Sequence, residues 1–159
     1  MATETNANDP MAVPAGSLDA PEFPILREGI KRLIIRDTEK KVSEKKTDTD
    51  VKITEYLSMR LTTTEDDKDT EGNIIYAGYS FLTTMFLTAN ERSSEKMVAE
   101  QIAMPIKAAL GRTTKVSPRD WINDPSLLND KVVDCKVGIR KGKDGFSDNN
   151  VVKSWIIPA

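Results

Sequence analysis

The chain has 159 residues, a formal net charge of −2, 38% hydrophobic and 30% charged residues, a balance that suits one soluble globular domain with a sizeable core. It has no histidine and a single cysteine, Cys135, which excludes Ser-His and Cys-His catalysis and an internal disulfide, and weighs against zinc. It has no run of about 18 apolar residues and no basic segment followed by an apolar stretch, so we expect neither a membrane span nor a secretory signal.

The first 22 residues (MATETNANDPMAVPAGSLDAPE) form a segment of distinct composition, with four acidic side chains, three prolines and no basic side chain. Such a composition is typical of a flexible tail. The tail is either a plain solubilising extension or a mobile acidic arm that competes with nucleic acid for a basic groove. The folded domain is then expected to span residues 23–159.

The first two strands are expected on either side of a charged linker. Residues 29–36 (GIKRLIIR) are dense in β-branched side chains, which predicts a strand. Residues 37–50 (DTEKKVSEKKTDTD) are expected to be a lysine-rich loop. Residues 51–62 alternate between apolar and polar side chains, which predicts a second, half-buried strand. Its apolar face holds Val51, Ile53, Leu57, Met59 and Leu61, with Glu55 interrupting it, and its polar face holds Lys52, Thr54, Tyr56, Ser58 and Arg60.

An acidic connection follows at residues 63–73 (TTEDDKDTEGN), in which Gly72 is a turn residue. Residues 73–88 (NIIYAGYSFLTTMFLT) are expected to form one long strand or a bent pair of strands. Gly78 lies in the middle of this stretch, where a bulge or a barrel corner would fall.

A helix is expected from about residue 94 to residue 110. Ser93 or Ser94 would cap its start, and Gly111 suits its C-terminal cap. Pro105 is expected to kink or split it. The apolar stripe that would cover the sheet repeats every four residues and consists of Val98, Ile102, Ile106 and Leu110. Residues 117–121 (SPRDW) predict one further helical turn.

Residues 131–158 predict a β-hairpin with a long basic loop. Cys135 lies in phase with the alternating apolar residues of the first strand of this hairpin, so its side chain is expected to point into the core. The predicted order is therefore three strands, a helix and two strands. That order matches a mainly β fold with one or two helices: the five-stranded OB-fold, a Greek-key barrel with a helix between strands three and four. A β-sandwich with a helical insertion is the alternative.

An OB-fold binds oligonucleotides across strands two and three, between the first and last loops. Basic and aromatic side chains fall on these elements, while the acids concentrate in the tail and in the second connection. The candidate nucleic-acid-binding residues are Lys40, Lys41, Lys45 and Lys46 in the first loop; Lys52, Tyr56 and Arg60 on the second strand; and Arg140, Lys141, Lys143 and Phe146 in the last loop. Tyr56 and Phe146 are the candidates for stacking on bases. The two loops are expected to face each other across the strand that carries Tyr56. The alternatives are that the lysine-rich loops are only solvated and that Tyr56 packs at the barrel rim.

Enzymatic interpretations find little support. The acidic run at residues 66–69 lacks the glycine and the terminal glutamate of a calcium loop. Residues 138–145 have neither the spacing nor the Lys-Ser/Thr ending of a phosphate-binding loop. We expect a protein that is not an enzyme and that uses no cofactor or metal.

Three segments resemble a family of small bacteriophage proteins. They are PEFPILREGIKRLIIRDTEKKVSEKK (residues 21–46), AALGR (residues 108–112) and LLNDKVVDCKVGIRKGKDGFSDNNVVKSWIIP (residues 127–158). The family begins with a short Pro-Leu-Pro-Glu-Gly motif and a strand, and it ends with a strand pair and a proline. Ile30 replaces the usual aromatic residue, and Asn129 and Asp130 stand where glycine is common. The resemblance implies an OB-fold and single-stranded-DNA binding in phage replication or recombination.

Two functions are therefore open. The first is a single-stranded-DNA-binding protein, largely independent of sequence, acting in phage-type DNA replication or recombination. It would be cytoplasmic (in the host cytoplasm if viral), could form a homo-oligomer, and could recruit replication or recombination proteins through its acidic tail. The second is a structural or adaptor β-barrel, either a phage particle component or a protein-docking module, with no nucleic-acid ligand.

Overall fold

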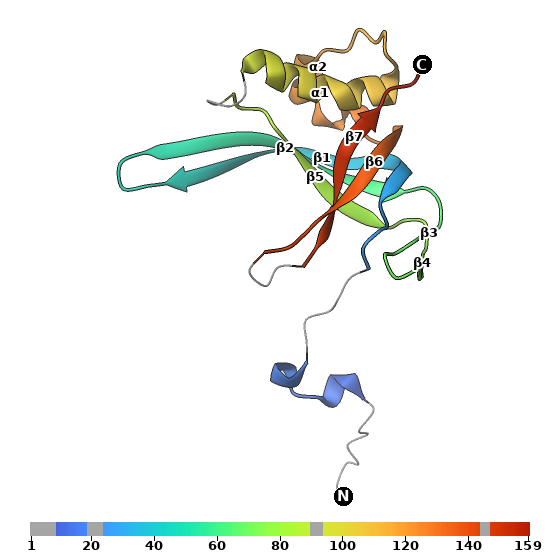
Figure 1. The fold of residues 1–159 in the computed structure, drawn as a ribbon. Coiled ribbons are helices and arrows are strands. Elements are labelled where there is room, and N and C mark those ends of the chain that lie inside the picture. Colours follow the sequence, from blue (N-terminus) through green and yellow to red (C-terminus); the bar gives the residue numbers. More distant parts are fainter. Residues whose placement is uncertain (1–8, 19–23, 90–93, 144–146) are drawn as a thin grey trace, which may run out of the picture.

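The computed structural model describes residues 9–18, 24–89, 94–143 and 147–159. Its body is one five-stranded antiparallel sheet in the order β5-β2-β1-β6-β7, with two helices packed on one side (Figure 1). The strands are β1 (Gly29–Lys46), β2 (Val51–Thr63), β5 (Ser80–Phe86), β6 (Val132–Arg140) and β7 (Asn149–Ile156), and the helices are α1 (Glu95–Leu110) and α2 (Pro118–Asn123). The prediction of a mainly β domain with one or two helices is confirmed. The sheet itself is open, with β5 and β7 as its two edges.

The smaller elements are a two-stranded ribbon and three short 3-10 turns. The ribbon pairs β3 (Asp67–Lys68) with β4 (Ile74–Ile75). The turns are η1 (Pro10–Ala12), η2 (Ala15–Ser17) and η3 (Pro125–Leu128). β3 lies within the segment expected to be a simple acidic connection, whereas β4 lies at the start of the predicted strand at residues 73–88. None of the helices in the described ranges is long and apolar enough to cross a membrane.

The core lies between the sheet and the helices. Alternate residues of β2 (Leu57, Met59 and Leu61) are fully buried, as their phase in the sequence predicted. They pack with the α1 stripe that includes Ile102 and Ile106. Further members of this core are Leu33, Ile35, Phe81, Val98, Trp121, Leu128, Val133, Cys135 and Val137. The helix stripe is thus a core element.

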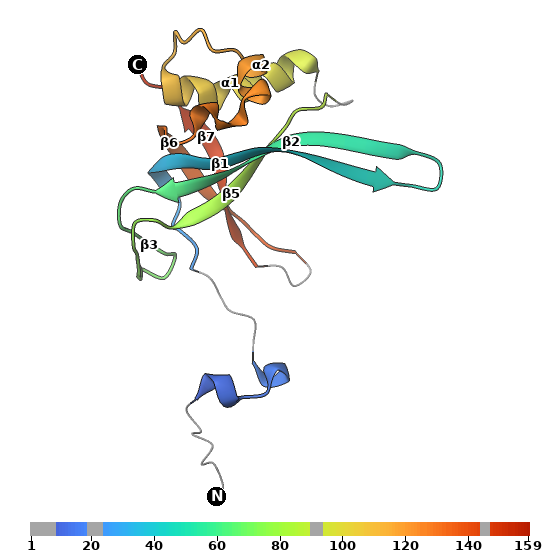
Figure 2. The same cartoon turned by 180° about the vertical axis from the view of Figure 1, so that it is seen from behind.

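The long hairpin formed by β1 and β2 corrects one prediction. Residues 37–46 were expected to be part of a loop, but they continue β1 and pair with β2 as far as Lys46 and Val51. A β-bulge at Asp37 and Thr38 marks the point where the hairpin leaves the body, since the register shifts between Arg36 and Glu39. We call the part beyond this bulge, residues 39–58, the arm. Figures 1 and 2 show it projecting far from the sheet.

The bulge is held by the chain that precedes β6. The backbone N–H and the hydroxyl of Thr38 both donate to Asn129 Oδ1, at 3.3 and 2.9 Å. Asp37 takes a positive φ of 50°, and its carboxylate pairs with Arg60 at 3.1 Å. These contacts fix the direction in which the arm leaves the body.

Helix α1 departs from its prediction at Pro105. Its predicted start is confirmed, because Ser94 accepts a hydrogen bond from the Met97 N–H, and so is its end, because Gly111 caps it with a φ of 100°. The helix nevertheless runs unbroken through Pro105, which is buried. Of the two predicted alternatives the split is therefore wrong, whereas a kink stays a prediction; burial against the core helps to offset the backbone hydrogen bond that proline cannot donate. Helix α2 begins at Pro118 as predicted, and the structure adds a capping box between Ser117 and Asp120.

The predicted strand at residues 73–88 is a bent pair, β4 and β5, with Gly78 at a φ of 97° between them. The β3–β4 ribbon is attached to the sheet by an ion pair of Lys31, a side chain only 8% exposed, with Asp67 at 2.6 Å. Burial alone would raise the pKa of Asp67, but hydrogen bonds from Lys31, the Lys68 N–H and Arg27 hold that pKa below its usual value.

The open edges of the sheet are joined by a side chain. Asn150 of β7 is 3% exposed, and its Oδ1 accepts from the Tyr79 hydroxyl, just before β5, and from the Leu26 N–H, both at 2.9 Å. Its Nδ2 donates to the carbonyls of Leu26 and Gly138. Burial raises the pKa of Tyr79, which keeps its hydroxyl protonated and able to donate. Asn150 therefore links β7, the start of β5 and the segment before β1.

Candidate nucleic-acid interface

The register of the arm divides its side chains between two faces. Directly opposed residues of an antiparallel pair share a face, and successive residues alternate. Lys41 lies opposite Tyr56, whereas Lys40 lies opposite Leu57, a core residue. We call the first side the Tyr56 face; along the arm it carries Glu39, Lys41, Ser43, Lys45, Lys52, Thr54, Tyr56 and Ser58. We call the second the Val42 face; it carries Lys40, Val42, Glu44, Lys46, Val51, Ile53 and Glu55.

This division sorts the predicted lysines. Lys41, Lys45 and Lys52 share the Tyr56 face, whereas Lys40 and Lys46 lie on the Val42 face with Glu55. The structure also explains Glu55, which breaks the apolar alternation. Its carboxylate lies 3.8 Å from the Lys40 ammonium at the root of the arm, where the second face begins to meet solvent. The four lysines predicted to act together thus divide into two pairs.

The root of the Tyr56 face carries an aromatic pair. Phe86, the last residue of β5, lies directly opposite Tyr56. Their ring centroids are 6.4 Å apart in an edge-on arrangement. Tyr56 is half-buried, whereas Phe86 is 62% exposed. Leu82, four residues before Phe86 in β5 and opposite Arg60, is 63% exposed on the same face. On the outer face of β2 and β5, the two adjacent rings are thus separated from Leu82 by the polar Ser58–Thr84 pair.

Phe86 is absent from the sequence-based candidates. The segment FLTTMF has large apolar side chains on both phases, so periodicity alone does not show which phase is exposed. Its pairing with β2 decides this: Phe81 lies opposite the buried Leu61, which turns Leu82 and Phe86 outward. The pairing of Phe86 with Tyr56, which the sequence alone does not give, is what identifies Phe86 as a candidate.

The cations of this region differ in their ion pairs. Arg60 is paired with Asp37 at 3.1 Å, and Lys41 lies 3.9 Å from Glu39. Such exposed pairs are worth at most about 1 kcal/mol, so a phosphate can compete for these cations. Further out, Lys45 lies directly opposite Lys52. Like charges in this position destabilise a hairpin, and a bound polyanion would relieve the repulsion.

The end of the β6–β7 hairpin forms a second basic site. Arg140 ends β6, and Lys141 and Lys143 follow it. A hollow of about 530 Å³ is lined by Arg140, Lys141, Gly142, Lys143, Ser147 and Asn149. The Gly142 N–H donates to Asp148 at 2.8 Å. Phe146, the second predicted stacking residue, lies outside the described residues.

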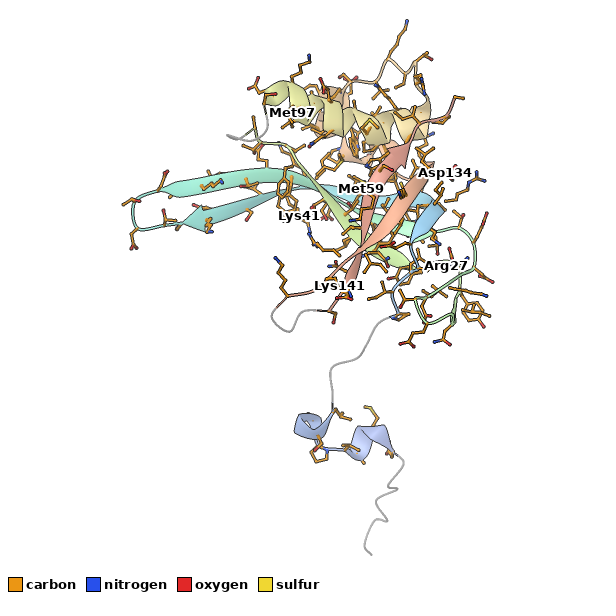
Figure 3. All side chains as sticks on the ribbon, viewed as in Figure 1. Arg27, Lys41, Met59, Met97, Asp134 and Lys141 are labelled. Carbon is orange, nitrogen blue, oxygen red and sulfur yellow. The ribbon has the colours of Figure 1, made fainter. Side chains whose placement is uncertain are left out.

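The two basic segments lie toward the same side of the molecule in the view of Figure 3. Lys41 is near the root of the arm and Lys141 is at the end of the β6–β7 hairpin, both on the side toward which the arm projects. Among the described residues, no hydrogen bond or ion pair joins the two segments. That they form one groove across Tyr56 stays a prediction.

Cys135 lies in the core and not on these basic surfaces. It is fully buried in β6, and burial raises the pKa of its thiol to about 12. A thiol with that pKa is protonated at neutral pH and is a poor nucleophile. Its predicted role as a core residue is confirmed.

Two comparisons with known proteins do not assign the chain to a family. A scan of the sequence against protein-family models found no match, and a search of curated proteins found none either.

Proposed function

We propose that this protein binds single-stranded DNA, largely independently of sequence, in phage-type DNA replication or recombination. It does so without catalysis or a cofactor. The observation that carries the proposal is the aromatic pair of the half-buried Tyr56 and the exposed Phe86, which lies beside a row of lysines on the same face of the sheet. Aromatic rings stack on bases of any sequence for about 1–3 kcal/mol each, and lysines neutralise the phosphates between them.

The order of the strands supports an OB-fold as the architecture. In chain order the strands of the sheet lie as third, second, first, fourth and fifth, and α1 lies between the third and the fourth. A partly open Greek-key barrel of the OB-fold type would have this order, which supports the proposal. The link from Tyr79 to Asn150 joins the two edges that such a barrel brings together. In an OB-fold, the outer face of the second and third strands, here β2 and β5, is the oligonucleotide-binding face.

The division of the arm lysines gives a direct test. Lys41 and Lys45 are exchanged for glutamate in one variant, and Lys40 and Lys46 in the matched control, which removes the same charge from the same strand. Binding of a fluorescent oligothymidine is measured by anisotropy from about 50 to 200 mM salt. If each lysine on the Tyr56 face neutralises one phosphate, the first variant loses about 1.4 from the log-log salt slope. The control retains most of the slope.

Two results would contradict this account in different ways. Equal loss in both variants would mean that the arm attracts DNA without a preferred face, which would reject the Tyr56 face but retain the ligand. No binding by the unmodified protein at about 50 mM salt and micromolar concentration would reject the function. A structural or adaptor role would then be favoured.

A further inference from the structure

The Val42 face of the arm exposes three apolar side chains that are not part of the core of the described chain. Val42 is 60% exposed, Val51 50% and Ile53 56%. All three lie on one face, because Val42 pairs with Glu55 and Val51 and Ile53 pair with Lys46 and Glu44. A two-stranded ribbon on its own is marginally stable in water, so a ribbon of this length calls for a covering surface.

The edges of the arm are open as well. Strand β6 pairs with β1 only from Gly29 to Ile34, and β5 pairs with β2 only from Tyr56 to Thr62. The Leu87 N–H and the Thr88 hydroxyl reach the backbone of Glu55, but the pairs nearer the tip have partners on one side only. Unpaired edges beside an apolar face are a surface that natural proteins either protect or use.

The Val42 face continues into a hollow under the helices. This hollow, of about 630 Å³, is bounded by Lys40 and Glu55 of the arm and has apolar walls from α1, α2 and the end of β5: Leu87, Val98, Ile102 and Ile122. Because Lys40 and Glu55 belong to both features, the apolar face and the hollow form one continuous surface between the arm and the helical layer.

The charges on the two faces indicate what covers this surface. On the Val42 face, Lys40 and Lys46 are balanced by Glu44 and Glu55, and at the edge of the hollow Arg119 is balanced by Glu95. On the Tyr56 face, three lysines stand against Glu39 alone. A partner of one dominant sign would leave half of the charges on the Val42 face unpaired. A second copy of the same face supplies both signs in equal number together with three apolar side chains, and a two-fold axis brings the same patch onto itself.

We propose that the Val42 face is the interface of a homodimer. The arm of each copy lies against the arm of the other and covers Val42, Val51 and Ile53. The two Tyr56 faces, whose lysines would repel each other, remain outside the interface. The proposal concerns a different surface from the proposed DNA site, and its test uses protein alone, so either can fail without the other.

The first experiment is sedimentation equilibrium of the full chain at concentrations up to about 100 µM. Val42→Asp with Ile53→Asp is compared with Ser43→Asp with Thr54→Asp, which adds the same charge at neighbouring positions on the opposite face. We expect a dimer for the unmodified chain and for the control, and a dimer dissociation constant raised by about a hundredfold or more for the first variant. Circular dichroism checks that both variants are folded, which their exposed positions favour.

A second experiment does not depend on disrupting the interface. Ile53→Cys and Thr54→Cys are each treated with a short bis-maleimide, while the buried Cys135 stays unreactive in the folded chain. Ile53→Cys is expected to give cross-linked dimer and Thr54→Cys monomer. A monomeric unmodified chain at the highest concentration, equal dissociation of both double variants, or cross-linking favoured at Thr54→Cys would each overturn the proposal.

Discussion

Replacing Phe86 by alanine is expected to weaken DNA binding without unfolding the protein. The ring is 62% exposed and its aromatic contact is with Tyr56, at a centroid separation of 6.4 Å. An edge-on aromatic pair is worth about 0.5–1.5 kcal/mol beyond the area that it buries, and most of the Phe86 ring is exposed, so the loss of stability is expected to be small. Losing one stacked base costs about 1–3 kcal/mol of binding free energy, equivalent to a rise in Kd of about 5- to 150-fold.

The control for this prediction is Tyr76→Ala. Tyr76 is 73% exposed, but it follows β4 and is not part of the strands that form the Tyr56 face. Anisotropy with a fluorescent oligothymidine measures the Kd of both variants, and thermal unfolding measures their stability. An unchanged Kd for Phe86→Ala, or an equal rise for Tyr76→Ala, would refute the assignment of Phe86 as a stacking residue.

Two further predictions concern stability. Asn150→Ala leaves the buried backbone of Leu26 and the hydroxyl of Tyr79 without their partner, and it should lower the free energy of unfolding by about 2–4 kcal/mol in urea titrations. Asn149→Ala, at the exposed neighbouring position, should have little effect; similar losses would show that Asn150 does not hold the edges together. The second prediction is a pH dependence: because the pKa of Asp67 is lower in the folded than in the unfolded state, its stabilising contribution is complete above about pH 4 and is lost as pH falls through the folded pKa. Asp67→Asn should therefore lower stability at neutral pH and flatten the acid limb of a pH titration of unfolding, and an acid limb as steep as that of the unmodified chain would contradict the ion pair with Lys31.

The parts of the fold that contact the core were predictable from the sequence. The phase of Leu57, Met59 and Leu61 and that of Cys135 follow from alternation against a buried layer. The stripe on α1 and its caps follow from the helical repeat and from local hydrogen bonding. In each case the burial or the cap of a residue can be predicted from the residues close to it in the sequence.

The arm and its faces were not predictable in the same way. Residues 39–46 are exposed throughout, so their strand has no apolar alternation and looks like a charged loop. Which lysines accompany Tyr56 depends on one bulge at Asp37 and Thr38, and the exposure of Phe86 depends on its cross-strand partner. Both are consequences of pairing between strands, which a single sequence does not display.

The bulge at the root of the arm also sets how the molecule can vary between relatives. Side chains alternate along a strand with a period of two, so adding or removing one residue between the bulge and the tip would exchange the two faces of that strand. Adding two residues to each strand would instead lengthen the arm by about 7 Å and leave both faces and the core as they are. Insertions of two residues in each strand can thus lengthen the arm in fixed steps without changing the packing of the body.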